Sequence, residues 1–352
     1  MNNRSSVLWG LPKRRIECEV VMNKQKTEPS IVALGGGTGL SNMLRGLKAH
    51  TSRLTAIVTM ADDGGGSGTL RDELGMPPPG DVRNCLQALA NTEPTMEQLL
   101  GYRFTEGGLK GQSMGNLFLA ALNDISGSFY EAIRKMSEVL AITGRVLPVT
   151  TVDVRLTAVF EDGTEVIGES KITEHKKRSD KRIMRVALFP KNPPALKDSI
   201  EAIENAELIL LGPGSLYTSI IPNLLTKGIA EAIAESDALK IYVLNVTTQD
   251  GETEGYTASD HVKALFAHSG RKLFDYCLAN SAPLPADVAL RYNTQGACQT
   301  VVDTDELEKL GVKTLMCPML DCSDGFARHD SKMLAREIMH LYKEKSPTKI
   351  YN

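Results

Sequence analysis

The sequence predicts an α/β fold of the Rossmann-like, doubly wound type, in which helices flank a mainly parallel sheet. Apolar, β-rich runs alternate with helical patterns along most of the 352 residues, which is typical of parallel strands joined by crossover helices. Two of these runs are each followed directly by a glycine-rich turn. A central stretch alternates apolar and polar residues and indicates an antiparallel β insertion.

Composition favours a large globular unit with small-molecule chemistry. The hydrophobic fraction is 42% and the formal net charge is -3, so no strong field attracts nucleic acid or an anionic membrane. The six cysteines form no C-x-x-C pair, which argues against a zinc ribbon or a disulfide framework. No apolar run approaches the roughly 20 residues of a membrane span. We expect a cytoplasmic protein with no nucleic-acid partner and no membrane span. Homo-oligomer formation is left open.

One domain is expected over residues 29–346, after a loose arm at 1–28 and before a short tail at 347–352. The arm shows no helical or strand period around Trp9, which is typical of poorly ordered termini. The strands are expected at 31–34, 54–60, 208–211, 241–246, 274–279 and 314–317. Helical patterns lie between them, and a final helix is expected to begin near Asp330.

The antiparallel insertion is expected at about 151–190. Apolar and polar residues alternate around Glu161-Asp162-Gly163-Thr164, a hairpin signal of the Asp-Gly type. The downstream part is rich in cations, namely Lys176, Lys177, Arg178, Lys181, Arg182 and Arg185. We interpret this part as a solvated sheet edge blunted by charge, and a docking surface for an anionic partner is the alternative.

The first glycine-rich turn, L-G-G-G-T-G-L, spans Leu34 to Leu40. Glycines at a strand-to-helix turn let backbone amides close around an anion, and the positive end of the next helix favours that charge. A dinucleotide fingerprint would require a third glycine where Leu40 stands, so an NAD site is disfavoured. The predicted anion contacts are Gly36, Gly37, Thr38 and Gly39.

A second loop, A-D-D-G-G-G-S-G, follows the second strand. The carboxyl ends of parallel strands meet at one edge of the sheet, so this loop and the first turn are expected in one crevice. Asp62 and Asp63 could bind Mg²⁺, accept hydrogen bonds from a ribose, act as general base or cap a turn. Gly65, Ser67 and Arg71 are predicted to hold an anion.

Further segments add candidate ligand residues. P-P-P-G-D-V-R-N at 77–84 is expected to start a helix with Asp81 as its N-cap, and a stiff connector is the alternative. L-G-P-G-S-L-Y-T-S at 211–219 is a second anion turn directly after a strand. The candidates in these two segments are Arg83, Asn84, Gly212, Gly214, Ser215 and Thr218. Two more candidates are Asn116, at the end of G-Q-S-M-G-N (111–116), and Asn245, at the start of N-V-T-T-Q (245–249).

These motifs, in this order, resemble the bacterial gluconeogenesis factor family, the YvcK-like proteins of the superfamily of 2-phospho-L-lactate transferase, CofD. The likeness rests on both glycine turns, the A-D-D-G-G-G-S-G-T-L-R loop, P-P-P-G-D-V-R-N and G-N-L-F-L-A-A-L, and covers roughly residues 30–345. It implies a Rossmann-like core that binds UDP-N-acetylglucosamine. It also implies a role in growth and cell shape on gluconeogenic carbon sources, with protein partners in cell-wall synthesis.

The resemblance also points to two residues late in the chain. It associates the sugar nucleotide with an aromatic residue and an arginine that match Tyr292 and Arg328. A tyrosine can stack on uracil and an arginine can pair with a diphosphate. Core packing is the alternative for Tyr292.

Two functions follow from these features. In the first, the chain is a regulator that binds the nucleotide sugar without turnover and requires no cofactor. In the second, it is a Mg²⁺-dependent transferase of the 2-phospho-L-lactate type, acting on a deazaflavin or another hydroxyl acceptor. In that case Asp62 and Asp63 would be catalytic and would hold the metal.

Overall fold

The computed structural model describes residues 28–179 and 181–346, so the predicted tail and all but residue 28 of the predicted arm lie outside the described residues. The core is one parallel sheet in the order β10-β9-β8-β7-β1-β2-β3, which confirms the predicted Rossmann-like class. Its strands are β1 (Ile31–Gly35), β2 (Leu54–Val58), β3 (Arg145–Pro148), β7 (Leu208–Leu211), β8 (Leu239–Val243), β9 (Tyr276–Asn280) and β10 (Lys313–Cys317).

The strand order explains where a ligand site can form. From β1 the chain moves outward to β2 and β3, and it then returns to place β7 on the other side of β1. All residues of β1, β2 and β7 are buried, as expected for strands covered on both faces. The winding direction reverses between β1 and β7, and ligands of such folds bind beyond the carboxyl ends of the strands at this point.

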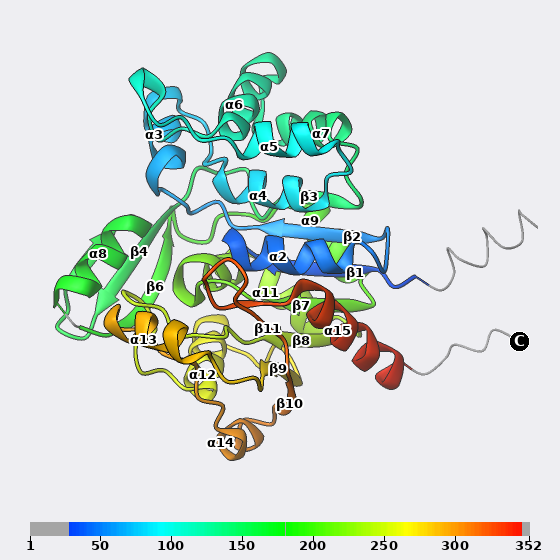
Figure 1. The fold of residues 1–352 in the computed structure, drawn as a ribbon, viewed down its shortest axis with the longest axis vertical. Coiled ribbons are helices and arrows are strands. Elements are labelled where there is room, and N and C mark those ends of the chain that lie inside the picture. Colours follow the sequence, from blue (N-terminus) through cyan, green and yellow to red (C-terminus); the bar gives the residue numbers. More distant parts are fainter. Residues whose placement is uncertain (1–27, 180, 347–352) are drawn as a thin grey trace, which may run out of the picture.

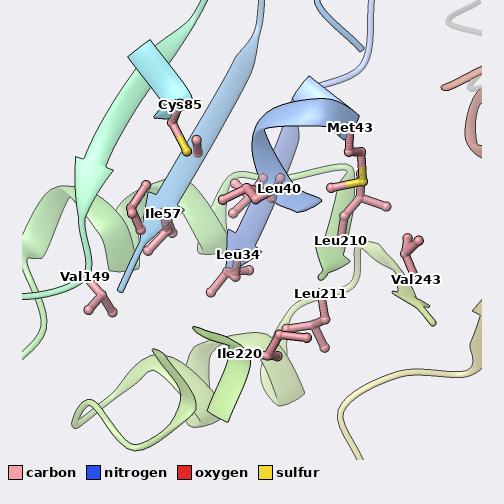
Figure 2. Close-up of a cluster of buried hydrophobic side chains, with 14 of the residues drawn as sticks. Leu34, Leu40, Met43, Ile57, Cys85, Val149, Leu210, Leu211, Ile220 and Val243 are labelled. Carbon is pink, nitrogen blue, oxygen red and sulfur yellow. The ribbon is translucent and has the colours of Figure 1, made fainter. Parts of the chain in front are cut away.

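Helices from the first half of the chain cover one side of the sheet and extend above it in Figure 1. They are α2 (Gly37–Leu47), α3 (Gly65–Leu74), α4 (Gly80–Leu89), α5 (Pro94–Gly101), the 3₁₀ turn η1 (Gly107–Leu109), α6 (Met114–Ser126) and α7 (Phe129–Val139). Helix α2 packs against α4 and against the C-terminal helix α15 (Ser331–Lys345). Figure 2 shows Leu40 and Met43 of α2 in the buried cluster with Leu34 of β1 and Ile57 of β2.

The second half alternates short helices with the remaining strands. Its elements are α9 (Lys197–Glu204), the π-helical turn η2 (Leu216–Ile220), α10 (Ile221–Leu224), α11 (Ile229–Glu235), α12 (Ala258–Ser269), α13 (Ala286–Thr294), α14 (Thr304–Lys309), β11 (Leu320–Asp321) and β12 (Arg328–His329). Helix α15 begins after Asp330, whose carboxylate accepts hydrogen bonds from the amides of Lys332 and Met333. This N-cap confirms the predicted helix start.

The insertion forms a separate antiparallel sheet, β5-β4-β6, built from β4 (Arg155–Phe160), β5 (Glu165–Ile167) and β6 (Ile183–Phe189). The antiparallel pairing and the hairpin turn between β4 and β5 were predicted correctly. The expected charged edge was right only for Arg185, which is exposed on the edge strand β6. It was wrong for Lys176, Lys177 and Arg178, because these lie on α8 (Glu169–Ser179), which separates β5 from β6. Figure 1 shows α8 beside β4 and β6 on the left-hand side of the molecule.

Across residues 28–179 and 181–346, none of the helices combines the length and apolar character that a membrane span requires.

Candidate functional site

A cavity of about 630 Å³ opens where the winding direction of the sheet reverses. Its walls come from the start of α2, the turn after β7, the segment after β8, helices α8 and α13, and β12. This volume falls within the usual range for small-molecule sites. The predicted ligand residues that line it are Gly36, Gly37, Thr38, Gly39, Gly214, Ser215, Asn245, Tyr292 and Arg328.

The first glycine turn brings the N-terminal end of α2 to the cavity wall. Its N-cap residue, Gly36, has no side chain to cap the helix. The Gly37 amide already donates to the buried side of the turn, to the Asp81 carboxylate, so the amides that follow it and the positive helix end can serve an anionic ligand. Gly39 lets this turn approach the second one, because a Cβ at Gly39 would lie 2.6 Å from the Pro213 carbonyl oxygen. The two glycine-rich turns therefore form adjoining parts of one wall.

The second glycine turn is held by side chains from the segment that follows β8. The Gly214 amide donates to Asn245 Oδ1 at 3.0 Å, and Asn245 Nδ2 donates back to the Gly214 carbonyl at 2.8 Å. Ser215 Oγ donates to Gln249 Oε1 at 2.8 Å. Because Asn245 fixes both polar groups of Gly214, its amide side chain shapes the turn as well as lining the cavity.

An internal carboxylate occupies the part of this turn that was expected to bind an anion. The amides of Leu216 and Thr218 each donate to Glu252 at 3.0 Å. Burial raises the pKa of Glu252 to about 7, although the hydroxyl of Thr218 and the surrounding amides lower it. Thr218 is buried, and neither it nor Gly212 lines the cavity. The predicted anion turn is thus reduced to its first half, Gly214 and Ser215.

The residues late in the chain, Tyr292 of α13 and the stretch 324–329, are held at the cavity by specific contacts. Tyr292 of α13 accepts a hydrogen bond from the Ala327 amide at 3.1 Å through its hydroxyl, and its side chain is half-buried rather than part of the core. Arg328 donates to Asp324 Oδ2 at 2.8 Å. Asn42 of α2 donates to the His329 carbonyl, so β12 is linked directly to the first turns of α2, next to the first glycine turn.

Several lining residues were not predicted as ligand contacts. The additional ones with polar side chains are Asn42, Thr173, Lys177, Ser219, Thr247, Thr248, Gln249, Asp250, Gln295 and His329. Polar residues directly after the β8 strand were a usable signal for Thr247 to Gln249. The sequence indicated Lys177 only as part of a cation-rich segment, for which an anionic partner was one alternative. Nothing in the sequence signalled Thr173, because helix α8 itself was not predicted.

A half-buried acidic cluster, formed by Asp62, Asp81 and Glu169, lies behind the first glycine turn and does not line the cavity. A Cβ at Gly36 would lie 2.3 Å from Asp81 Oδ2. Burial raises the pKa of all three carboxyl groups, to about 7 for Asp81, and neighbouring carboxylates raise them further. Asp81 is not the N-cap that was expected, because α4 already begins at Gly80.

Asp63 caps helix α8 instead of pairing with Asp62 at the cavity. Its Oδ2 accepts from the Glu169 amide at 3.0 Å, and its Oδ1 accepts from the amide and hydroxyl of Ser170, both at 2.8 Å. These contacts correct the expectation that Asp62 and Asp63 act together, since both oxygens of Asp63 already serve the helix start.

The acidic cluster can accommodate a divalent cation only with help from a ligand. In the part of the chain that the structure describes, no group of three or more His, Cys, Asp or Glu side chains is arranged to hold a metal ion. Glu169 Oε2 is nevertheless buried without a hydrogen-bond partner. Mg²⁺ commonly uses one or two carboxylates plus ligand phosphates. Asp62 and Glu169 would be its protein ligands, and a phosphate would have to reach past the first glycine turn to share it, because neither residue lines the cavity.

The other predicted ligand residues are outside the cavity. Arg71 is buried, pairs with Asp153 and donates to the Val154 carbonyl, so it attaches α3 to the insertion. Arg83 is mostly buried, and a Cβ at Gly115 would lie 2.6 Å from its Cδ, which reflects close packing of α4 on α6. The remaining predicted residues that do not line the cavity are Gly65, Ser67, Asn84 and Asn116.

Comparison with known proteins agrees with this architecture. The family described as 2-phospho-L-lactate transferase CofD matches residues 31–320. A relative from Thermoanaerobacterium thermosulfurigenes is 52% identical over 313 residues, which cover 89% of this chain and 97% of that one. The gluconeogenesis factor of Bacillus subtilis is 46% identical over 318 residues, covering 90% and 99% of the two chains.

The chain belongs to the gluconeogenesis factor family of CofD-like proteins. A crystal structure of a UPF0052 family protein from Bacillus halodurans has the same fold, with a TM-score of 0.85 and 47% identity. The match covers 88% of this chain and 99% of that one. The resemblance inferred from the sequence motifs is therefore confirmed at the level of the family.

Proposed function

We propose that the chain is a gluconeogenesis factor that binds UDP-N-acetylglucosamine in the 630 Å³ cavity and regulates growth and cell shape on gluconeogenic carbon sources. The observation that carries this proposal is the convergence of the α2 helix start, Gly214-Ser215 and the Tyr292 and Arg328 side chains on one cavity. These are the groups that a diphosphate and an aromatic base require.

The cavity offers a separate environment to each part of such a ligand. The amides at the start of α2 and the Arg328 guanidinium suit the diphosphate, and the Tyr292 ring suits the uracil. The hydroxyls and amides of Thr247, Thr248 and Gln249, which also line the cavity, suit the hydroxyl groups of the sugar. Binding would shift a conformational or partner equilibrium, with partners in cell-wall synthesis, and would require no cofactor.

Calorimetric titration with UDP-N-acetylglucosamine tests this proposal. Tyr292→Ala and Arg328→Ala are each expected to weaken binding about tenfold or more, the scale of one lost stacking or charge-assisted contact. Tyr102→Ala is the control, because Tyr102 is exposed and does not line the cavity. Failure of the wild type to bind at millimolar ligand would contradict the proposal.

The acidic cluster and the CofD family match favour one second candidate, a Mg²⁺-dependent transferase of 2-phospho-L-lactate to a hydroxyl acceptor. Asp62 is the carboxylate that would orient the acceptor, since Asp63 caps α8. The test is product formation from a phospholactyl nucleotide and a deazaflavin alcohol with Mg²⁺. Product that is lost with chelator and in Asp62→Asn would support it, whereas no product with any nucleotide donor would exclude this reaction.

A further inference from the structure

Helix α8 of the insertion places a cation on the wall of the cavity. Lys177 lines the cavity, and its Nζ lies 2.7 Å from Oδ2 of Asp250, which lines it too. Their side chains are 48% and 34% exposed, so both are accessible to a ligand. Among the described lining residues, only Lys177, Arg328 and Asp250 carry a full charge at neutral pH, because burial lowers the pKa of His329 to about 4.

The position of the Lys177 backbone is fixed, whereas its ammonium group depends on one surface contact. The neighbouring Lys176 is buried and pairs with Glu254 at 3.0 Å, and Asp63 caps the helix start. A Cβ at Gly251 would lie 2.9 Å from Lys177 Cε, so the loop packs closely on the lysine stem. An exposed ion pair such as Lys177–Asp250 contributes little stability. Lys177 can therefore exchange Asp250 for another anion at a small cost in free energy.

We propose that Lys177 binds the diphosphate of the nucleotide sugar, and that Asp250 holds its ammonium group at the cavity wall when no ligand is present. On binding, the ammonium group exchanges the Asp250 carboxylate for a phosphate oxygen. A diphosphate carries more negative charge than one carboxylate, which favours the exchange. This inference rests on the proposed function, because it assigns one contact within the same site.

Calorimetric titration of UDP-N-acetylglucosamine with charge variants of this pair tests the inference. Lys177→Gln is expected to weaken binding about tenfold or more and to flatten the dependence of affinity on salt concentration. Lys177→Arg should keep most of the affinity. The matched control is Lys171→Gln, which removes an exposed cation of the same helix that does not line the cavity. It should bind like the wild type.

Asp250→Asn separates exchange from a purely structural ion pair. If Lys177 changes partners, Asp250→Asn should bind the ligand as tightly as the wild type or a few-fold more tightly, because the ammonium group has no carboxylate to leave. Equal weakening by Asp250→Asn and Lys177→Gln would overturn the inference. Equal affinity of wild type and Lys177→Gln would overturn it as well, while leaving the proposed function intact. Absence of binding by the wild type would overturn both.

Discussion

At the scale of single residues, glycines, which have no Cβ, determine how closely the two glycine turns and the acidic cluster approach one another. Gly36 has an extended backbone, with φ at -168°, so its conformation is open to any residue. Its constraint is steric, since a Cβ would lie 2.3 Å from Asp81 Oδ2 and 2.8 Å from Thr59 Cγ2. The glycine is thus required by packing between the cavity wall and the cluster behind it.

Gly36→Ala is expected to lower the free energy of unfolding by about 1–3 kcal/mol, the usual cost of overpacking. It should also weaken ligand binding, because the α2 helix start must move. Gly108→Ala is the matched control, since a Cβ there would meet nothing within 4 Å. Urea denaturation of both variants measures the difference, and equal stability would contradict this account of Gly36.

The raised pKa of the Asp81 carboxyl group predicts a specific pH dependence of the free energy of unfolding. This pKa is raised from 3.8 to about 7, mainly by burial, so between these values the folded state holds a proton that the unfolded state has lost. The contribution of Asp81 to stability is therefore present at low pH and is lost as pH rises towards 7, with a slope of up to about 1.4 kcal/mol per pH unit.

Asp81→Asn should remove that slope. Buried histidines such as His329 have lowered pKa values and contribute with the opposite sign, so the informative quantity is the wild-type curve minus the variant curve. We expect this difference in the free energy of unfolding, measured by urea denaturation from pH 4.5 to 8, to fall as pH rises. A flat difference would show that Asp81 is ionised in the folded protein throughout this range.

At the scale of elements, α8 connects the insertion to the cavity. It is capped from outside by Asp63, attached by Lys176 to Glu254 and placed with Thr173 and Lys177 on the cavity wall. The helix is largely polar, with only Ile172 and Lys176 buried. Its position therefore depends on these few polar contacts more than on an apolar face.

Asp63→Ala is expected to lower the free energy of unfolding by about 1 kcal/mol, the usual value of an N-cap. Hydrogen exchange at the first turn of α8 should accelerate, because the amides of Glu169 and Ser170 lose their acceptor. Asp72→Ala is the control, since its pair with Arg155 is long, at 3.4 Å, and largely exposed, and such pairs contribute little stability. Unchanged exchange in α8 would show that Asp63 is not needed as a cap.

At the scale of the whole molecule, the cavity joins segments that are nearly 300 residues apart in the chain, from Gly36 to His329. Binding should therefore stabilise the whole fold. At a free ligand concentration about 100 times Kd, UDP-N-acetylglucosamine is expected to raise the free energy of unfolding by about 2.7 kcal/mol. A shift of the thermal midpoint measures this, and chelator should leave the shift unchanged if the chain is a regulator that needs no metal.

Arg328→Ala provides the comparison for this prediction, since it should require a higher ligand concentration for the same midpoint shift. No shift in the wild type at any concentration would argue against a ligand that bridges these distant segments.

The parallel sheet could be inferred from the chain alone, and about half of the predicted ligand residues line the cavity. Strands such as β1 and β7 are continuous apolar runs followed by glycine turns, and both features are local. β3 was missed because it is short and follows several helices. Helix α8 was missed because its charged sequence lacks an apolar stripe, and its stability comes from Asp63 and Glu254, which lie far away in the sequence.

The sequence by itself determined the fold class, the family and the glycine turns, because each depends on residue types at fixed local spacing. Only the tertiary structure decided which polar groups remain free for a ligand. Asp63 and Glu252 lie next to the predicted turns but already satisfy the amides of α8 and of the turn after β7. Lys177 reaches the cavity because of how the insertion folds back. Hydrogen-bond satisfaction depends on partners distant in the chain, and local spacing does not specify those partners.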